Sequence, residues 1–444
     1  MWLKTQRAVS CLWVGLCLVC LSSPVLPGQT ITDKPSADAP PDVTRRLEEL
    51  EREIGRLQAE LARLRKEVGS PSRPAPEASV APAPASPSPP ASEPAPEASS
   101  PPSASFWGST HFNVLLDGYY GYNFNHPTNR LSGLRSFDGP TNQFALNLVE
   151  FTLDKPAAAR SRLGYHLAAG FGQALKVVNA TEPGDPGMTQ YLKEAYISYL
   201  APVGKDLLVD FGKFVTPHGA EVIESRDNWN YSRGLLFSFA IPYYHFGLRA
   251  KYTFNPKVYL AGFLVNGWNN VVDNNTGKTV GVSLGLTPHK KFSLIQNYMA
   301  GPEQAGMNSG WRQLSDTLVT ISPTDKLSFM VNYDYGHGDR VTSLMAPVHW
   351  SGVAAYARYA FNESNALAFR YEHYRDHDGF TTGTAQQING VTGTFEHRIA
   401  KRLSTRWEFR RDMSDQAVFM RGNGFAKAQN TLAGGLMYDI DLRD

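Results

Sequence analysis

The chain has very little cysteine, and all of it lies in one place. Its three cysteines, Cys11, Cys17 and Cys20, fall within residues 1–28. We expect these residues to be a secretory signal peptide, because a positively charged start precedes a short apolar run over residues 11–21. A mature chain without cysteine excludes disulfides and catalysis by a thiol.

Long apolar runs are also missing after this segment, and the mean hydropathy is only −0.32. A membrane-spanning helix is therefore excluded from the mature chain, but a strand-built membrane protein is not, since only alternate residues of a barrel strand face lipid. An excess of charge of one sign is lacking too, because 43 Lys and Arg nearly balance 41 Asp and Glu. This balance names no favoured ion. We find neither a phosphate-binding glycine loop nor a basic helix, so we expect no nucleic-acid partner.

Catalytic patterns are equally scarce. Ser225 and Ser232 are the serines nearest to His218, but neither sits in a nucleophile elbow. The best candidate for a metal cluster is a set of polar residues at an expected strand end, namely His373, Asp376, His377 and Asp378. Polar residues accumulate at such ends in any case. We therefore expect no enzyme activity, no metal and no cofactor, and weigh a barrel enzyme as a minor alternative.

What the chain does contain is a rhythm that starts near Phe106 and runs to the C-terminus. Stretches of about ten alternating residues are joined by connections that are in turn short and long. Short ones lie at Lys155-Pro156, Ala201-Pro202, Asn255-Pro256, Thr287-Pro288, Ser322-Pro323, Asn362 to Asn365, and Ala400 to Arg402. Long ones start at Phe124, Gln173, Pro217, Asn269, Gly301, Gly336, Asp376 and Asp412. Such sorting is typical of an outer-membrane barrel. We predict an all-β fold, a transmembrane antiparallel β-barrel of about 16 strands over residues 106–444.

The expected strands are 107–123, 143–154, 162–172, 191–200, 206–215, 242–254, 258–268, 279–286, 292–300, 313–321, 327–335, 350–361, 366–375, 388–399, 403–411 and 430–440. Alternation places Tyr244, Phe246 and Leu248 toward lipid and Arg249 and Lys251 toward water. Aromatic residues recur near strand ends, as membrane–water boundaries favour. They are Tyr119, Tyr120, Tyr122, Tyr243, Tyr244, Tyr259, Trp268, Tyr298, Trp311, Trp350, Tyr371 and Tyr438.

Two segments separate the signal from the barrel. Residues 42–69 are expected to form a coiled coil with an oligomerisation seam at Leu47, Leu50, Ile54, Leu57, Leu61, Leu64 and Val68. We expect a homotrimer, with a dimer second. Residues 70–105 form a Pro/Ala/Ser-rich linker that cannot bury a core and should be disordered. A rod on a long tether leaves open a structural role, joining the outer membrane to peptidoglycan with incidental conduction.

The connection from Pro217 to Ala240 is the longest and the richest in charge. We expect it to fold into the lumen as a pore constriction loop, although a surface loop that never enters the pore stays open. Its charged candidates are Glu221, Glu224, Arg226, Asp227 and Arg233. By alternation the opposing pore wall carries Arg249, Lys251, Arg358, Arg370, Glu372, Arg398, Arg406, Glu408 and Arg410. Loop carboxylates facing wall arginines would set a transverse field that favours polar solutes.

Several short motifs around this loop carry a family resemblance. Gly212-Lys213-Phe214, Gly219-Ala220-Glu221, Asn230-Tyr231-Ser232-Arg233-Gly234 and Asn266-Gly267-Trp268-Asn269 resemble the OmpL-like outer-membrane β-barrel porin family. The resemblance implies a porin: a water-filled channel for passive diffusion of small polar or charged solutes. The coiled coil is similar to that of phosphate-selective porins, which are trimers. We therefore expect a location in the lipid bilayer of a Gram-negative-type outer membrane, with the N-terminal region in the periplasm.

Overall fold

The computed structural model describes residues 109–183, 187–339 and 346–441, together with Arg52 and Arg56. The expected signal peptide and linker lie outside the described residues. Of the expected coiled coil only Arg52 and Arg56 are described, both helical and exposed, so the seam residues Leu47 to Val68 also lie outside. Within the described part of the chain, no helix is long and apolar enough to cross a membrane.

Sixteen antiparallel strands close into a barrel, as the alternation predicted. The first half consists of β1 (His111–Asn123), β2 (Gln143–Lys155), β3 (Leu163–Phe171), β4 (Leu192–Ala201), β5 (Leu207–Val215), β6 (Tyr244–Asn255), β7 (Val258–Val265) and β8 (Thr279–His289). The second half consists of β9 (Phe292–Gln304), β10 (Met307–Ile321), β11 (Leu327–Gly338), β12 (Val348–Asn362), β13 (Asn365–Asp376), β14 (Gln386–Ala400), β15 (Leu403–Ser414) and β18 (Ala428–Asp441). The smaller elements are α3 (Gln173–Val178), η2 (Gly187–Tyr191), η3 (Ser225–Asp227), η4 (Leu236–Ala240) and the hairpin β16 (Phe419–Arg421) and β17 (Gly424–Ala426).

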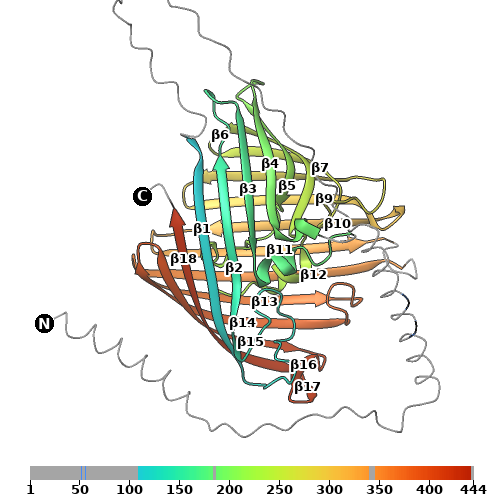
Figure 1. Cartoon of the computed structure of the whole chain (residues 1–444), viewed down its shortest axis with the longest axis vertical. Coiled ribbons are helices and arrows are strands. Elements are labelled where there is room, and N and C mark those ends of the chain that lie inside the picture. Colours follow the sequence, from blue (N-terminus) through green and yellow to red (C-terminus); the bar gives the residue numbers. More distant parts are fainter. Residues whose placement is uncertain (1–51, 53–55, 57–108, 184–186, 340–345, 442–444) are drawn as a thin grey trace, which may run out of the picture. The chain divides into compact units, whose positions relative to one another are not determined.

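The last strand closes the barrel against the first. Tyr120 of β1 pairs with Gly434 of β18, and the red β18 lies beside the blue β1 in Figure 1. Each remaining barrel strand pairs with its neighbours in sequence. Closure satisfies every strand edge, which lipid requires because it offers no hydrogen bonds to open backbone.

Alternation along the strands produces an apolar outer surface and a polar, charged interior. On β13, Leu367, Phe369 and Tyr371 are exposed, whereas Arg370 and Glu372 at the alternate positions are fully buried. The other strands repeat the pattern. Exposed outer residues include Leu116, Phe151, Ile197, Phe211, Leu248, Leu264, Val282, Trp311, Phe329, Tyr359, Phe395, Trp407 and Leu436. This is the distribution expected of a barrel with lipid outside.

The short and long connections also sort as predicted, with one exception. The expected long connection from Gly301 is wrong, because β9 and β10 extend until only Ala305 and Gly306 join them. Gly306 adopts a φ of 71°, which a two-residue hairpin turn requires and which glycine accepts without strain. On the same side, the connection from Asp412 starts later than expected, after Ser414, and contains the β16–β17 hairpin.

Several aromatic assignments also need correction. Tyr120, Tyr298, Trp311, Tyr371 and Tyr438 are exposed as a boundary belt would be. In contrast, Tyr119, Tyr243, Tyr244 and Trp350 are buried. Tyr244 was expected to face lipid, but its hydroxyl donates to Glu182 and to the Asn269 carbonyl at 2.6 Å, and the Lys213 ammonium lies 3.9 Å from its ring centre. The β3–β4 connection therefore covers this part of the wall.

Candidate functional site in the barrel lumen

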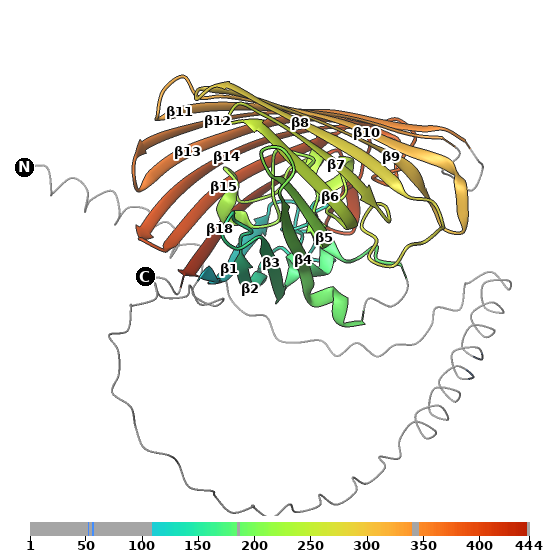
Figure 2. The same ribbon diagram turned by 90° about the horizontal axis from the view of Figure 1, so that it is seen from above.

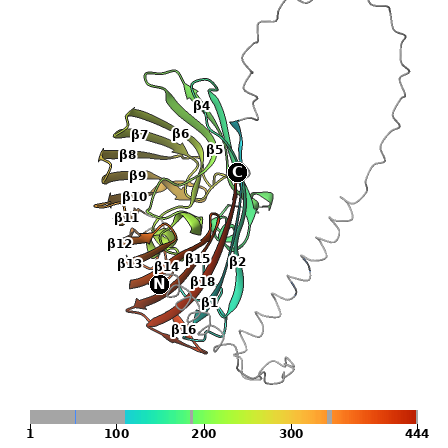
Figure 3. The ribbon, with the colours of Figure 1, turned by 90° about the vertical axis from the view of Figure 1, so that its left-hand side faces the viewer.

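The longest connection, residues 216–243, folds into the barrel. It leaves β5 at Val215, carries η3 and η4, and returns at Tyr244 of β6. Figure 3 shows its green ribbon between the two walls, and Figure 2 shows the same segment enclosed when the molecule is turned. Ser225, Asn230 and Ser232 are fully buried, which a surface loop could not be. The prediction of an inward loop is therefore correct, and the surface-loop alternative is wrong.

Carboxylates of the far wall hold the backbone amides of the loop. Glu408 of β15 accepts hydrogen bonds from Tyr231 N–H at 2.7 Å and Ser232 N–H at 3.2 Å. Glu372 of β13 accepts from Leu235 N–H at 2.6 Å. Gly234 makes this approach possible, because a Cβ at that position would overlap the Glu372 carboxylate. Charge-assisted bonds of this kind are about twice as strong as neutral ones.

Arginines of the same wall hold the loop carbonyls. Arg370 donates to Ser232 O at 2.6 Å and also pairs with Glu221 at 2.6 Å and with Glu372 at 2.8 Å. Arg406 donates to the carbonyls of Ser225, Arg226 and Asn230. Arg410 donates to Arg233 O at 2.8 Å while pairing with Asp412 at 2.7 Å. Three wall arginines thus bind the loop backbone directly.

The start and the middle of the loop are also fixed, by strands on other parts of the wall. Near its start, Gly219 N–H donates to Asp316 of β10 at 3.1 Å, and Ala220 N–H to Asn332 of β11 at 3.0 Å. On the opposite side, Asp117 of β1 accepts from Tyr231 OH at 2.9 Å. The loop therefore spans the lumen from wall to wall, because β1 and β10 lie far apart in the strand order of the barrel.

An apolar cluster completes the contact around η4. Leu235, Leu236 and Phe237 pack with Trp350 of β12 and Tyr374 of β13, and all five are buried. The Trp350 indole N–H donates to Ala240 O at 3.0 Å. An apolar core inside a barrel is unusual for a water-filled lumen, and it restricts the space beside η4.

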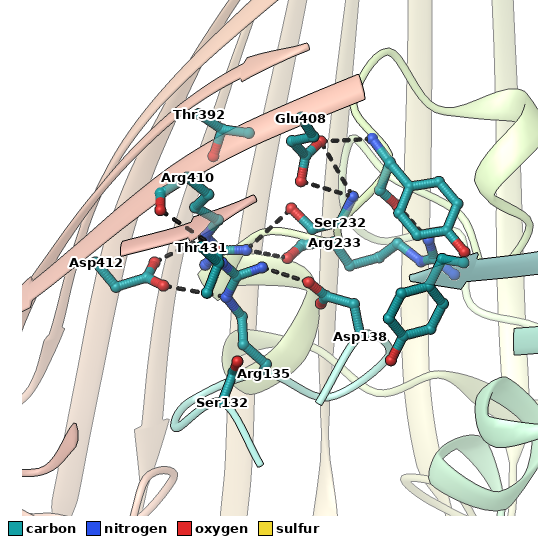
Figure 4. A network of polar contacts seen from close by, with 12 residues as sticks. Ser132, Arg135, Asp138, Ser232, Arg233, Thr392, Glu408, Arg410, Asp412 and Thr431 are labelled. Atoms are coloured by element: carbon teal, nitrogen blue, oxygen red, sulfur yellow. Dashed lines mark hydrogen bonds and ion pairs between the residues drawn. The ribbon is translucent and has the colours of Figure 1, made fainter. Parts of the chain in front are cut away.

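The first long connection, residues 124–142, joins the same network. Arg135 pairs with Asp138 of its own loop and with Asp412 of β15 at 3.0 Å, and donates to Thr431 at 2.7 Å (Figure 4). Asp412 thereby bridges Arg135 and Arg410, which links both loops to one carboxylate. Burial lowers the pKa of Arg135, but the Asp138 and Asp412 carboxylates together outweigh this effect, so the pKa is raised.

The charged residues predicted on the loop divide into bound and exposed groups. Glu221 and Arg233 are buried; Arg233 donates to Tyr231 O at 2.6 Å and Ile223 O at 2.8 Å. Glu224 pairs with Lys193 of β4. Arg226 pairs with Asp439 of β18 at 2.8 Å, and Asp227 is exposed beside it.

The predicted wall residues also fall into two groups. Arg370, Glu372, Arg406, Glu408 and Arg410 are buried against the loop. The expected arrangement of wall arginines across water from loop carboxylates therefore does not apply to them: Arg370 touches Glu221, and the others bind backbone.

The second wall group lies nearer the short connections. Arg249 pairs with Asp210 at 2.7 Å, and Arg358 pairs with Glu396 at 3.1 Å. Lys251 and Arg398 are exposed. Among the predicted wall residues, these four cations are the charges that solvent can reach.

Burial changes the proton affinity of two loop residues. It lowers the pKa of His218 to about 4, against a weaker opposing effect of Asp316. Burial also raises the pKa of Glu221, although the neighbouring Arg370 guanidinium acts in the opposite direction. At neutral pH, His218 is therefore an uncharged hydrogen-bond partner of Thr216, whose hydroxyl lies 3.0 Å from Nδ1.

Sequence reasoning missed several anchors. Asp117, Asp316 and Asn332 are inward strand positions whose only signal is a polar residue in an alternating run. Lys193 reaches inward because a bulge interrupts the β3–β4 register at Ala168/Ala169. Alternation alone could have nominated the first three but not their loop partners.

The four candidate residues for a metal cluster do not point toward a common site. His373 contacts Asn389 at 3.0 Å, while Asp376 accepts backbone N–H groups of Phe380 and Thr381. Among the described residues, no three His, Cys, Asp or Glu side chains are placed to hold a metal ion.

Comparison with known proteins identifies the family. The sequence profile described as "Putative beta-barrel porin-2, OmpL-like" matches residues 109–440, which is nearly the whole barrel. The chain belongs to this family. Membership makes it a porin-like barrel of the outer membrane, in agreement with the resemblance seen around the loop.

Solved structures share the fold of this family member. An anion-selective porin from Comamonas acidovorans has a TM-score of 0.51 at 9% identity, covering 75% of this chain and 99% of that one. The trimer form of OmpT, an outer membrane protein of Vibrio cholerae, has a TM-score of 0.50 at 13% identity, covering 74% and 99%. No curated protein matches the chain significantly.

Proposed function

We propose that this protein is an outer-membrane channel for passive diffusion of small polar or ionic solutes, and that loop 216–243 sets its bore. Barrels of 16 strands are wide enough to leave an aqueous channel when nothing fills them. The observation that carries the proposal is the loop pinned across the lumen by Glu372, Glu408, Arg370, Arg406 and Arg410. Family membership supports the same function.

The accessible charges among the predicted wall residues favour anions. Lys251 and Arg398 are exposed on the inward face and pair with no carboxylate among the described residues. Arg249 and Arg358 are partly exposed beside Asp210 and Glu396. A cationic mouth raises the local concentration of anions and lowers that of cations. The likeness in fold to an anion-selective porin is consistent with this preference.

We also propose a homotrimer joined through residues 43–68, with the N-terminal region in the periplasm. The heptad seam supports self-association, and OmpT, which shares the fold, is recorded in a trimer form. Deleting residues 43–68 should reduce the mass of the detergent-solubilised assembly. Unchanged mass would assign assembly to the barrel instead.

Solute flux into liposomes tests the channel function. Refolded protein should admit small ions and small neutral sugars and exclude larger oligosaccharides, with chloride entering faster than potassium. Folding is checked independently by gel electrophoresis, in which an unheated, folded barrel migrates at a different rate from the heat-unfolded chain. Properly folded protein that leaves the liposomes impermeable to every solute would refute the proposal.

A further inference from the structure

One sector of the outer surface departs from the apolar pattern of the rest. On the membrane-facing side of β11, β13 and β15, exposed Tyr335, Tyr371 and Phe409 end the apolar belt toward the long connections. The next outward positions are polar. They are His337, His349, His373, Arg375, His377 and Arg411, which we call the outer basic patch.

Strand pairing brings four of these residues together, namely His337, His349, Arg375 and His377. His337 and His349 are direct partners across β11 and β12, with ring centres 4.7 Å apart. The ring of His377 lies 6.5 Å from that of His349. Arg375 pairs with Ser351 across β12 and β13, placing the arginine beside the histidines. The patch contains four of the chain's eleven histidines.

The two arginines of the patch differ from those inside the barrel. Arg375 and Arg411 are exposed, and neither pairs with a carboxylate among the residues that the structure describes. Arg411 donates only to Asn430 Oδ1, at 3.0 Å. On the inward face of the same two strands, Arg370 and Arg410 each pair with a carboxylate.

Nearby carboxylates are already engaged with the barrel backbone. Asp378 accepts from His349 N–H at 2.8 Å and lies 3.7 Å from the same ring. Asp415 accepts from Gln387 N–H at 2.9 Å. Neither carboxylate forms an ion pair with Arg375 or Arg411 in the described part of the chain, so both guanidinium groups can bind a ligand outside the protein.

The position of the patch identifies that ligand. A cation on the lipid face of a barrel is costly at the membrane midplane and is tolerated near the interface. Exposed tyrosines mark the same level, because their amphipathic rings favour the headgroup region. We propose that the outer basic patch binds the phosphate groups of anionic lipids in the adjacent leaflet, with Arg375 and Arg411 as the charged anchors and the imidazoles as additional hydrogen-bond donors.

A lipid accounts for the patch better than a small ligand does. The patch continues directly into the apolar belt at Tyr371 and Phe409, so headgroup and acyl chains can be bound together. Its two arginines lie on β13 and β15, which are separated by β14, rather than converging on one point. The inference depends on the membrane location of the barrel and not on conduction.

Lipid titration followed by native mass spectrometry tests the inference. Detergent-solubilised protein is titrated with bisphosphorylated lipid A and with phosphatidylcholine. We expect preferential binding of lipid A, weakened about fivefold for each arginine in Arg375→Gln and Arg411→Gln and about 25-fold in the double variant, corresponding to about 1 kcal/mol per cation at an anionic surface. Dephosphorylated lipid A should bind no better than phosphatidylcholine.

A matched pair of charge removals provides the control. Lys176 and Lys278 are exposed on other long connections, so Lys176→Gln/Lys278→Gln removes the same charge away from the patch. This variant should keep wild-type affinity. Equal losses in both double variants, or equal binding of both lipids, would overturn the inference. So would inorganic phosphate alone displacing lipid A, which would indicate a site for free anions. The substitutions His349→Gln and His377→Gln should cause a smaller loss of lipid A affinity. They provide a second test if the arginine variants fold poorly.

Discussion

Arg370→Gln is the substitution that most specifically challenges the pinned loop. The Arg370 guanidinium is fully buried and contacts two carboxylates, Glu221 of the loop and Glu372 of the wall, as well as the Ser232 carbonyl. Glutamine keeps a hydrogen-bonding side chain but removes the charge. Glu221 and Glu372 then lose the cation between them, and only the more distant Arg410, 3.9 Å from Glu372, remains. The Glu221 end of the loop loses its anchor.

The size of the effect follows from the burial of the pair. Removing one partner of a buried ion pair typically costs about 3–5 kcal/mol, because the remaining charge stays buried and unpaired. Each 1.4 kcal/mol is about tenfold in an equilibrium. If that cost falls on loop docking, the undocked population should increase by about 100- to 4,000-fold, while the strands keep their pairing.

Thiol labelling can report this population. Ser232 is fully buried in the docked loop, and the three native cysteines can be replaced by serine. In that background, the modification rate of Ser232→Cys should follow the fraction of open loop, provided that opening is fast relative to labelling. We expect Arg370→Gln to accelerate labelling by the factor above.

Arg358→Gln supplies the matched control. Arg358 is also an inward arginine paired with a glutamate, but its side chain is 31% exposed and it does not touch the loop. A partly exposed pair contributes about 1 kcal/mol or less, so labelling should change by less than about fivefold. If Arg370→Gln labels no faster than this control, the clamp does not hold the loop.

Three further outcomes are expected. Lys251→Gln/Arg398→Gln should shift the reversal potential in a salt gradient toward cations, whereas Lys278→Gln should leave it unchanged; no shift would remove the assigned anion preference. Trp350→Ala should destabilise the barrel by about 3–5 kcal/mol, read as a lower urea midpoint, because it leaves a cavity in the apolar cluster around η4. Burial lowers the pKa of His218 from 6.5 to about 4, so between these values the unfolded chain binds a proton that the folded chain does not, and stability should fall as pH drops through this window. A urea midpoint with the same pH slope in His218→Gln would contradict that assignment.

The barrel was predictable because its main signal is local. A side-chain period of two over strands such as β13 marks the inner and outer faces without knowledge of the partners. Strand ends were less accurate. The β9–β10 hairpin continues well beyond the expected end at residue 300. The extension was missed because apolar and polar residues no longer alternate clearly there.

The loop was predictable as an inward segment but not as a bound one. Its length and charge pointed to the lumen, yet the same pattern suits a loop facing water. Arg370 and Arg406 were selected as wall residues for their inward parity, which is correct. Their partners are loop carbonyls and Glu221, and contacts of that kind leave no trace in the spacing of one chain. The role of Arg135, from a different loop, was missed for the same reason.

The central claim is that loop 216–243, pinned in the lumen, sets the bore of the channel. Single-channel conductance in planar bilayers tests it directly when wild-type protein is compared with a variant in which residues 221–239 are replaced by a short glycine–serine link. We predict small, regular steps for the wild type and markedly larger steps for the variant, with gel migration confirming that both are folded. Equal conductance of the two folded proteins would contradict the claim.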